Sequence, residues 1–109
     1  MPLIVTGLPS ATIASGGTTS NAIGLFDDAW GLTVYTPATI TSTSGLQVQV
    51  EPTSTGTNFV VLQSGGVDVF VPQARATVIS PVPFQQIRFV SSVAEGQTDT
   101  ITMTKAVLT

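Results

Sequence analysis

Apolar and polar residues alternate along several short segments of this chain, and this alternation predicts β-strands with one buried face. In residues 46–51 the apolar side chains of Leu46, Val48 and Val50 alternate with two glutamines and a glutamate. In residues 98–107 Ile101 and Met103 alternate with threonines. We expect the apolar positions of both segments to face a common core.

Other segments are also predicted as strands because they are rich in apolar and β-branched residues and are bounded by turn-forming residues. These segments are residues 21–26, 30–36, 59–63, 67–71, 76–79 and 84–90. No segment keeps apolar residues at helical spacing for the roughly 10–12 residues that a helix needs. The pattern predicts an all-β, single-domain β-sandwich or jelly roll of about seven to eight antiparallel strands. A small barrel fits the same periodicity.

Three connections are predicted to close hairpins. Gly65 and Gly66 separate two apolar runs, and glycine adopts the positive φ that tight hairpin turns require. Asp27, Asp28 and Ala29 separate residues 21–26 from 30–36. Ala94-Glu95-Gly96-Gln97 separates residues 84–90 from 98–107. We expect a hairpin at each of these three places.

Residues 1–20 differ from the rest because they contain no charged residue. An apolar patch, Leu3-Ile4-Val5, precedes a Gly/Ser/Thr stretch at residues 15–20 that is typical of a flexible joint. We interpret residues 1–20 as an extended N-terminal arm and residues 21–109 as the β-domain, with an ordinary edge strand as the open alternative. The segment lacks a basic start and is cut by Gly7 and Pro9, so it is a poor signal peptide. We expect a chain that is made in the cytoplasm and stays soluble, or that leaves by a route the sequence does not encode.

Composition changes this picture in one respect: only 8% of the residues are charged, against roughly 25% in an average domain. A surface so poor in charge indicates that other protein covers part of it, since free monomers rely on charge for solubility. The net charge of −3 and the three basic residues, Arg75, Arg88 and Lys105, argue against a nucleic-acid partner. No apolar run approaches the roughly 20 residues of a membrane span.

The residue types also restrict the chemistry. Without cysteine or histidine, the chain cannot form disulfides, bind zinc through those ligands or use imidazole catalysis. It contains no Gly-x-Ser-x-Gly elbow, and Gly65-Gly66 lacks the following Lys-Ser/Thr of a phosphate loop. We therefore predict no enzyme activity, no catalytic residue and no cofactor.

Asp27 and Asp28 form the one acidic pair, which in a turn could bind a hard cation together with Glu51. Their spacing lacks the ordered pattern of a calcium loop. We expect a capped turn and no metal site.

Trp30 and Tyr35 stand five residues apart on one predicted strand and therefore on opposite faces. We expect Trp30 in the core, because the chain has few large residues to fill it, and Tyr35 on the surface. Arg88 and Asp99 are predicted to form a cross-strand ion pair.

Residues 40–107 resemble small virion proteins of tailed bacteriophages of the capsid decoration, or cement, type. The resemblance is carried by Gly45-Leu46-Gln47-Val48-Gln49-Val50, Ser64-Gly65-Gly66-Val67-Asp68-Val69, Pro83-Phe84-Gln85-Gln86-Ile87-Arg88-Phe89-Val90-Ser91 and Thr100-Ile101-Thr102-Met103-Thr104-Lys105. It is one of strand order and of a Thr/Ser/Gln surface, with no catalytic motif. It implies a jelly roll or β-sandwich, often trimeric, that binds the major capsid protein between capsomers.

The function predicted from sequence is therefore a structural virion protein that forms a homo-oligomer, a trimer, and stabilises a phage capsid. Its candidate interface residues are Leu3, Ile4, Val5 and Tyr35. The alternatives are a carbohydrate- or receptor-binding module of a phage fibre and a tail or neck structural component. A hydrolase that uses only carboxylates is disfavoured, because no second pair of acids is present.

Overall fold

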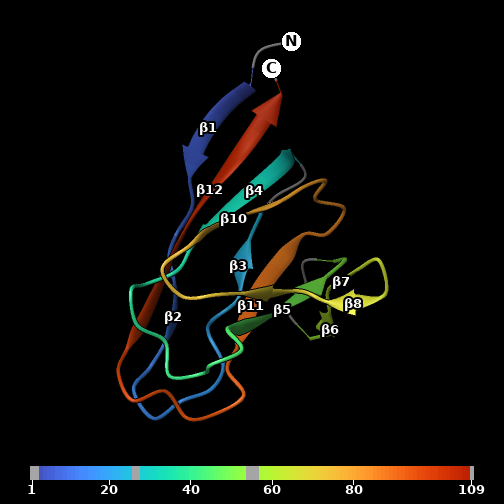
Figure 1. Cartoon of the computed structure of the whole chain (residues 1–109). Helices are drawn as coiled ribbons and strands as arrows, with labels where there is room; N and C mark the ends of the chain where they lie inside the picture. Colours follow the sequence, from blue (N-terminus) through green and yellow to red (C-terminus); the bar gives the residue numbers. More distant parts are fainter. Residues whose placement is uncertain (1–2, 26–27, 54–56, 109) are drawn as a thin grey trace.

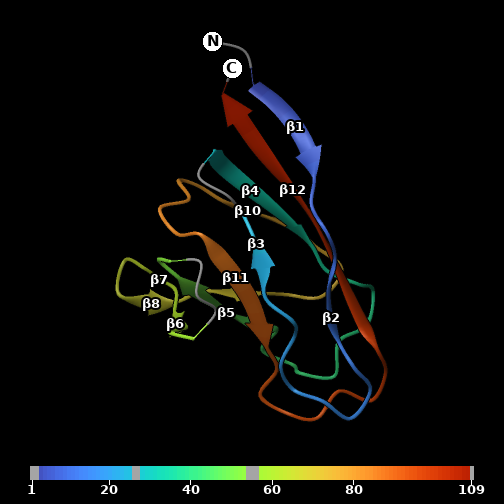
Figure 2. The ribbon, with the colours of Figure 1, turned by 180° about the vertical axis from the view of Figure 1, so that it is seen from behind.

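Two antiparallel β-sheets pack face to face in a β-sandwich (Figures 1 and 2). This computed structural model describes residues 3–25, 28–53 and 57–108. Within these residues the secondary structure is strand and turn, with no helix, so the predicted all-β class is confirmed. The Cα radius of gyration is 13.3 Å, as expected for one compact domain of about 100 residues.

The first sheet, here called the β12 sheet, is built around the ten-residue strand β12 (Asp99–Leu108). Strand β4 (Ala29–Tyr35) lies on one side of β12 and is followed by β10 (Ala76–Ile79) at the edge. On its other side β12 pairs with β1 (Leu3–Gly7) along its C-terminal half and with β2 (Ala11–Ile13) at its start.

The second sheet, here called the β5 sheet, has the order β3-β11-β5-β6, with β9 also paired to β5. Its strands are β3 (Ile23–Gly24), β11 (Gln86–Val90), β5 (Leu46–Glu51), β6 (Val60–Val61) and β9 (Phe70–Val71). A small hairpin joins β7 (Gln63–Ser64) to β8 (Val67–Asp68). The described residues thus form twelve strands, more than the seven to eight predicted. The segments 59–63 and 67–71 are each divided into two short strands, and β1 and β2 add two strands in residues predicted as an arm.

The core lies between the two sheets and is formed by the alternate residues that the sequence pattern selected. Leu46 and Val48 of β5 and Ile101 and Met103 of β12 are fully buried. Phe89 of β11 is the largest fully buried side chain. Burying such a side chain contributes about 1.5–3 kcal/mol, so this layer holds the sandwich together.

The predicted Gly65-Gly66 turn is confirmed. Gln63 pairs with Asp68 and Ser64 with Val67, which leaves the two glycines as a two-residue loop. Their φ angles are 62° and 81°, as a type I′ hairpin turn requires at both central positions.

The other two predicted hairpins are wrong. Strand β3 pairs with β11, whereas β4 pairs with β12 and β10, so residues 21–26 and 30–36 enter different sheets. Strands β11 and β12 also belong to different sheets. Both connections cross from one sheet to the other. The alternation of apolar residues does not reveal this, because it marks a buried face and not the neighbour with which a strand pairs.

The structure places residues 3–13 within the β12 sheet, as in the edge-strand alternative, and not in an arm set apart from the domain. Ala11 and Ile13 of β2 are fully buried, so the core begins well before residue 21. The Gly/Ser/Thr stretch is also fixed to the domain, because Gly16 N–H bonds to the Glu95 carbonyl and Ser20 N–H to the Phe89 carbonyl.

Candidate interaction surface

The outer face of the β12 sheet, the side turned away from the β5 sheet, carries no Asp, Glu, Lys or Arg side chain among its described residues. Its members follow from the register, since Ile101 and Met103 point into the core and the alternate positions point outward. Up to the pair formed by Val5 and Ala106, beyond which Leu108 also points outward, they are Val5, Thr12, Thr33, Tyr35, Ala76, Val78, Thr100, Thr102, Thr104 and Ala106. We call this set the threonine face.

Three larger side chains of the threonine face are well exposed. Val78 is 70% exposed on β10, Val5 is 68% exposed on β1 and Tyr35 is 42% exposed on β4. Their positions span three strands of the sheet, with Thr102 of β12 directly beside Tyr35. The structure therefore places the predicted interface residues Val5 and Tyr35 on the same face, although they are far apart in sequence.

Strand β1 and the end of β12 extend past the body of the sandwich, where both chain ends lie (Figures 1 and 2). Ile4 is 51% exposed and Val5 is 68% exposed, although neighbouring residues of a strand point to opposite faces. Leu3, the remaining residue of the predicted apolar patch, pairs with Leu108 through its backbone. This end of the β12 sheet thus exposes apolar side chains on both of its faces.

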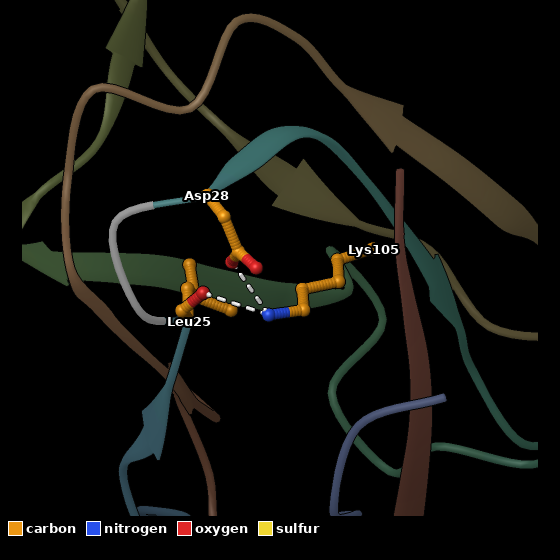
Figure 3. Close-up of polar contacts among 3 residues, drawn as sticks. All are labelled: Leu25, Asp28 and Lys105. Atoms are coloured by element: carbon orange, nitrogen blue, oxygen red, sulfur yellow. Dashed lines mark hydrogen bonds and ion pairs between the residues drawn. The ribbon is translucent and has the colours of Figure 1, made fainter. Parts of the chain in front are cut away.

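Lys105 lies at the edge of the core, next to the extended end of β1 and β12. It occupies an inward position of β12 opposite Leu32, and its side chain is only 8% exposed. Its Nζ lies 2.7 Å from Asp28 Oδ1 and donates to the Leu25 carbonyl at 3.5 Å (Figure 3). The hydrogen bond from Lys105 lowers the pKa of Asp28. The long apolar stem of Lys105 thus closes the core while its charge reaches an acidic partner at the rim.

Trp30 is 49% exposed, so the prediction that it lies in the core is wrong. On β4, Gly31 pairs with Ala106 and Ala29 with Val107, which leaves Trp30 between them without a partner on β12. Such a β-bulge adds one residue to a strand and shifts the alternation of its side chains. Trp30 and Tyr35 are therefore both exposed, at opposite ends of β4.

The outer face of the β5 sheet is chemically different. Arg88 Nε donates to Gln49 Oε1 at 2.8 Å, and Gln49 Nε2 donates to Gln47 Oε1 at 3.1 Å. The Arg88 guanidinium also lies 4.3 Å from the centroid of the Phe59 ring, a cation–π contact. The predicted ion pair between Arg88 and Asp99 is wrong, because Asp99 is buried in the β12 sheet.

The acidic residues considered for a cation site are engaged separately. Asp27 lies outside the described residues, and Asp28 is paired with Lys105. Glu51 is fully buried, and its carboxylate accepts from Thr53 Oγ1 at 2.9 Å and from Asn58 N at 3.0 Å. In residues 3–25, 28–53 and 57–108, no three Asp or Glu side chains gather in a way that could hold a metal ion.

A cleft of about 440 Å³ borders the β10 edge of the β12 sheet. Its lining contains no ionisable residue, and its apolar part is formed by Leu62, Val69, Val78, Ile79, Pro81 and Pro83. Val78 belongs both to this cleft and to the threonine face. The uncharged surface of the molecule therefore continues around the edge of the sheet, a feature that the sequence pattern did not indicate.

No protein-family model, curated protein or solved structure matches the chain. Among the described residues, no helix is long and apolar enough to cross a membrane.

Proposed function

We propose that this protein is a structural subunit that binds other protein through the threonine face and the adjoining edge strand β1. The observation that carries this proposal is the absence of charged side chains from the threonine face, where Val5, Tyr35 and Val78 are exposed. Protein interfaces are depleted of charged residues at their centre, and aromatic residues are enriched there. Binding at this face buries no charge.

The edge of the β12 sheet supports the same function. Strand β1 pairs on one side with β12 and forms the end of the sheet. The free edge of a strand presents backbone N–H and C=O groups that can pair with another strand, and proteins often block such edges with lysine, proline or a bulge. Residues 3–7, Leu-Ile-Val-Thr-Gly, contain none of these blocking features. We infer that β1 contributes to a contact between protomers.

In its specific form, the proposed subunit is a capsid decoration protein that assembles as a trimer and binds the major capsid protein between capsomers. This specific form of the proposal rests on the resemblance of residues 40–107 to phage virion proteins and on the small number of charged residues in the chain. Repeated contacts from several protomers strengthen the hold on a shell, because each contact raises the effective concentration of the next.

A second candidate is a carbohydrate- or receptor-binding module, which the exposure of Trp30 and Tyr35 favours. Aromatic rings with one apolar plane and one polar group suit sugar rings and protein surfaces alike. The two rings stand five residues apart on one strand, about 16 Å along the chain, so one small sugar would not contact both. A tail or neck component is a further form of the same structural function.

The chain supplies a matched pair of variants to test the proposal. Val5 and Val67 are both valines on strands and are both 68% exposed, but only Val5 belongs to the threonine face. We expect Val5→Lys to lower the oligomeric mass measured by sedimentation and to reduce binding to empty phage shells by about tenfold or more. Val67→Lys should leave both measurements unchanged.

The melting temperature of each variant serves as the control for folding. Loss of assembly with an unchanged melting temperature supports the proposed interface. If Val5→Lys assembles and binds shells as well as the parent while a glycan array shows saturable binding, the structural function is wrong and the carbohydrate-binding module replaces it.

A further inference from the structure

Two buried carboxyl groups lie at the end of the sandwich away from the chain termini. The connections at residues 14–22, 36–45 and 91–98 meet there (Figures 1 and 2). Glu95 is 1% exposed and Asp99 is fully buried. Neither residue takes part in the interface proposed above, so this site requires an explanation of its own.

Glu95 is held as an ionised carboxylate. Its Oε1 accepts from Thr41 N at 2.8 Å and from Gln97 Nε2 at 3.2 Å. Its Oε2 accepts from Ser42 N at 3.1 Å and from Ser91 Oγ at 2.7 Å. Each oxygen thus has two donors, and these donors come from two of the three connections. The side chain fastens residues 41–42 to residues 91–97.

Only one of the two carboxyl oxygens of Asp99 accepts a hydrogen bond from the described residues. Its Oδ1 accepts from Gln97 Nε2 at 2.6 Å, but its Oδ2 is buried without a hydrogen-bond partner among the described residues. A buried polar atom without a partner is destabilising, and more so if it is charged. A proton on Oδ2 would remove the charge and turn this atom into a donor.

We propose that Asp99 carries a proton on Oδ2 and donates it in a hydrogen bond to Glu95, and that this shared proton locks residues 41–42 and 91–99 together. A carboxyl group and a carboxylate that share one proton avoid the repulsion that two ionised groups would suffer. The proton also supplies the one hydrogen bond that the cluster lacks.

The electrostatics agree with this assignment. Burial raises the pKa of Asp99, and the neighbouring Glu95 raises it further, so that the value is about 6 despite the opposing bond from Gln97. Burial also acts to raise the pKa of Glu95. Hydrogen bonds from Asp99, Ser91 and the backbone at residues 41–42 outweigh it and lower the pKa to about 2. Residues 11–22, 37–48 and 89–100 contain no other ionisable side chain.

A bound cation would satisfy Asp99 Oδ2 less well than a proton. A shared proton needs one short contact between the two carboxyl groups, and Gln97 Nε2, which donates both to Glu95 Oε1 and to Asp99 Oδ1, shows that they are adjacent. A calcium ion takes six to eight oxygen ligands, and in this cluster it would have to displace the donors that hold Glu95. The geometry therefore favours a proton.

The shared proton gives the stability of the fold an unusual dependence on pH. The pKa of Asp99 is raised in the folded state from 3.8 to about 6, so its stabilisation is complete below 3.8 and is lost as the pH rises through 6. The pKa of Glu95 is lowered from 4.5 to about 2, so its stabilisation is lost as the pH falls below 4.5. Together the two groups place the maximum of the free energy of unfolding near pH 4. Deprotonation of Asp99 lowers this free energy as the pH rises through 6.

Melting temperatures of the full chain at pH 4.5 and pH 7.5 test the proposal. We expect the wild-type value to fall by about 5–10 °C between these two conditions. Asp99→Asn should remove most of this fall, because an amide can donate to Glu95 at either pH and still accept from Gln97. Asp68→Asn serves as the control, since Asp68 lies in the β7–β8 hairpin and accepts from Gln63, and it should keep the wild-type pH dependence.

A second measurement uses the wild-type protein and therefore does not require a variant that folds. A carbon-13 NMR titration of the wild-type Asp99 carboxyl should show a midpoint near 6, and a midpoint at or below 4 would overturn the proposal. Calcium added at pH 7.5 provides a further test. If it raises the melting temperature of the wild type but not of Asp99→Asn, the site binds a cation and the proposal is wrong. No effect of calcium supports the proton.

Discussion

The outer faces of the two sheets are formed by the same alternation of residues but have different chemistry. On the β5 sheet, Arg88 bonds to Gln49 and lies against Phe59, so the polar side chains find partners within the chain. On the β12 sheet, the threonine face exposes hydroxyl, methyl and isopropyl groups and no charge. On the outer face of the β5 sheet the polar side chains contact one another, whereas the threonine face exposes its side chains to solvent.

The difference shows that the few charged side chains are distributed unevenly over the surface of this protein. Charged side chains are depleted from one whole sheet face, where a partner would otherwise have to displace water from ionised groups. The β5 sheet keeps its Arg88 and the glutamines near it, which stabilise the domain itself. We therefore expect substitutions on the β5 sheet to affect folding and substitutions on the threonine face to affect assembly.

The largest expected effect lies at Gly45, where the backbone enters the β5 sheet. Its φ is +87°, and a Cβ at this position would lie 2.6 Å from the Val71 carbonyl oxygen. Gly45→Ala should therefore lower the free energy of unfolding by about 2–4 kcal/mol through strain and steric clash. The control is Gly65→Ala, where φ is +62° but no atom lies within 4 Å. It should lose only about 1–2 kcal/mol, as measured by urea unfolding, and equal losses would contradict the role of the close approach.

An intermediate effect is expected at Arg88 on the outer face of the β5 sheet. Arg88→Met keeps most of the apolar stem but removes the hydrogen bond to Gln49 and the cation–π contact with Phe59. The free energy of unfolding should fall by about 1–2 kcal/mol, while the sedimentation mass stays that of the parent. A variant that loses assembly but not stability would show that the β5 sheet, too, is an interface.

The smallest effect on stability is expected at Thr102, near the middle of the threonine face. It is exposed and pairs with Tyr35 across β12 and β4. Thr102→Lys should change the free energy of unfolding by less than about 0.5 kcal/mol, as is usual for exposed positions, but should reduce assembly because it places a charge in the contact. Thr102→Ser is the matched uncharged control. If the lysine variant assembles normally, the threonine face is not the contact surface.

Prediction from sequence succeeded where local chemistry decides the structure. Leu46 and Val48 alternate with polar residues, and the same positions are buried in the sandwich. The Gly65-Gly66 turn was predicted because glycine adopts positive φ at no steric cost. Tyr35 was expected on the surface, and it is exposed.

Prediction failed where the exposure or the partner of a residue depends on a strand that is distant in the sequence. Trp30 was expected in the core, but it lies at the bulge where β4 meets β12 and is exposed. Arg88 and Asp99 were expected to pair, but β11 and β12 enter different sheets. Sequence reasoning also missed the cluster of Glu95 and Asp99, because two of the four donors to Glu95, the N–H groups of Thr41 and Ser42, lie more than 50 residues away in the sequence.

The sequence by itself determined the all-β class, the inward positions of the main strands and the scarcity of charge, because these depend on residue type and on spacing over a few positions. Only the tertiary structure decided which strands share a sheet, because alternation specifies a face and not a neighbour. It also decided that the uncharged residues of β1, β4, β10 and β12 form one face and that Asp99 is buried beside Glu95. These properties depend on contacts between residues far apart in the chain, which a local pattern cannot encode.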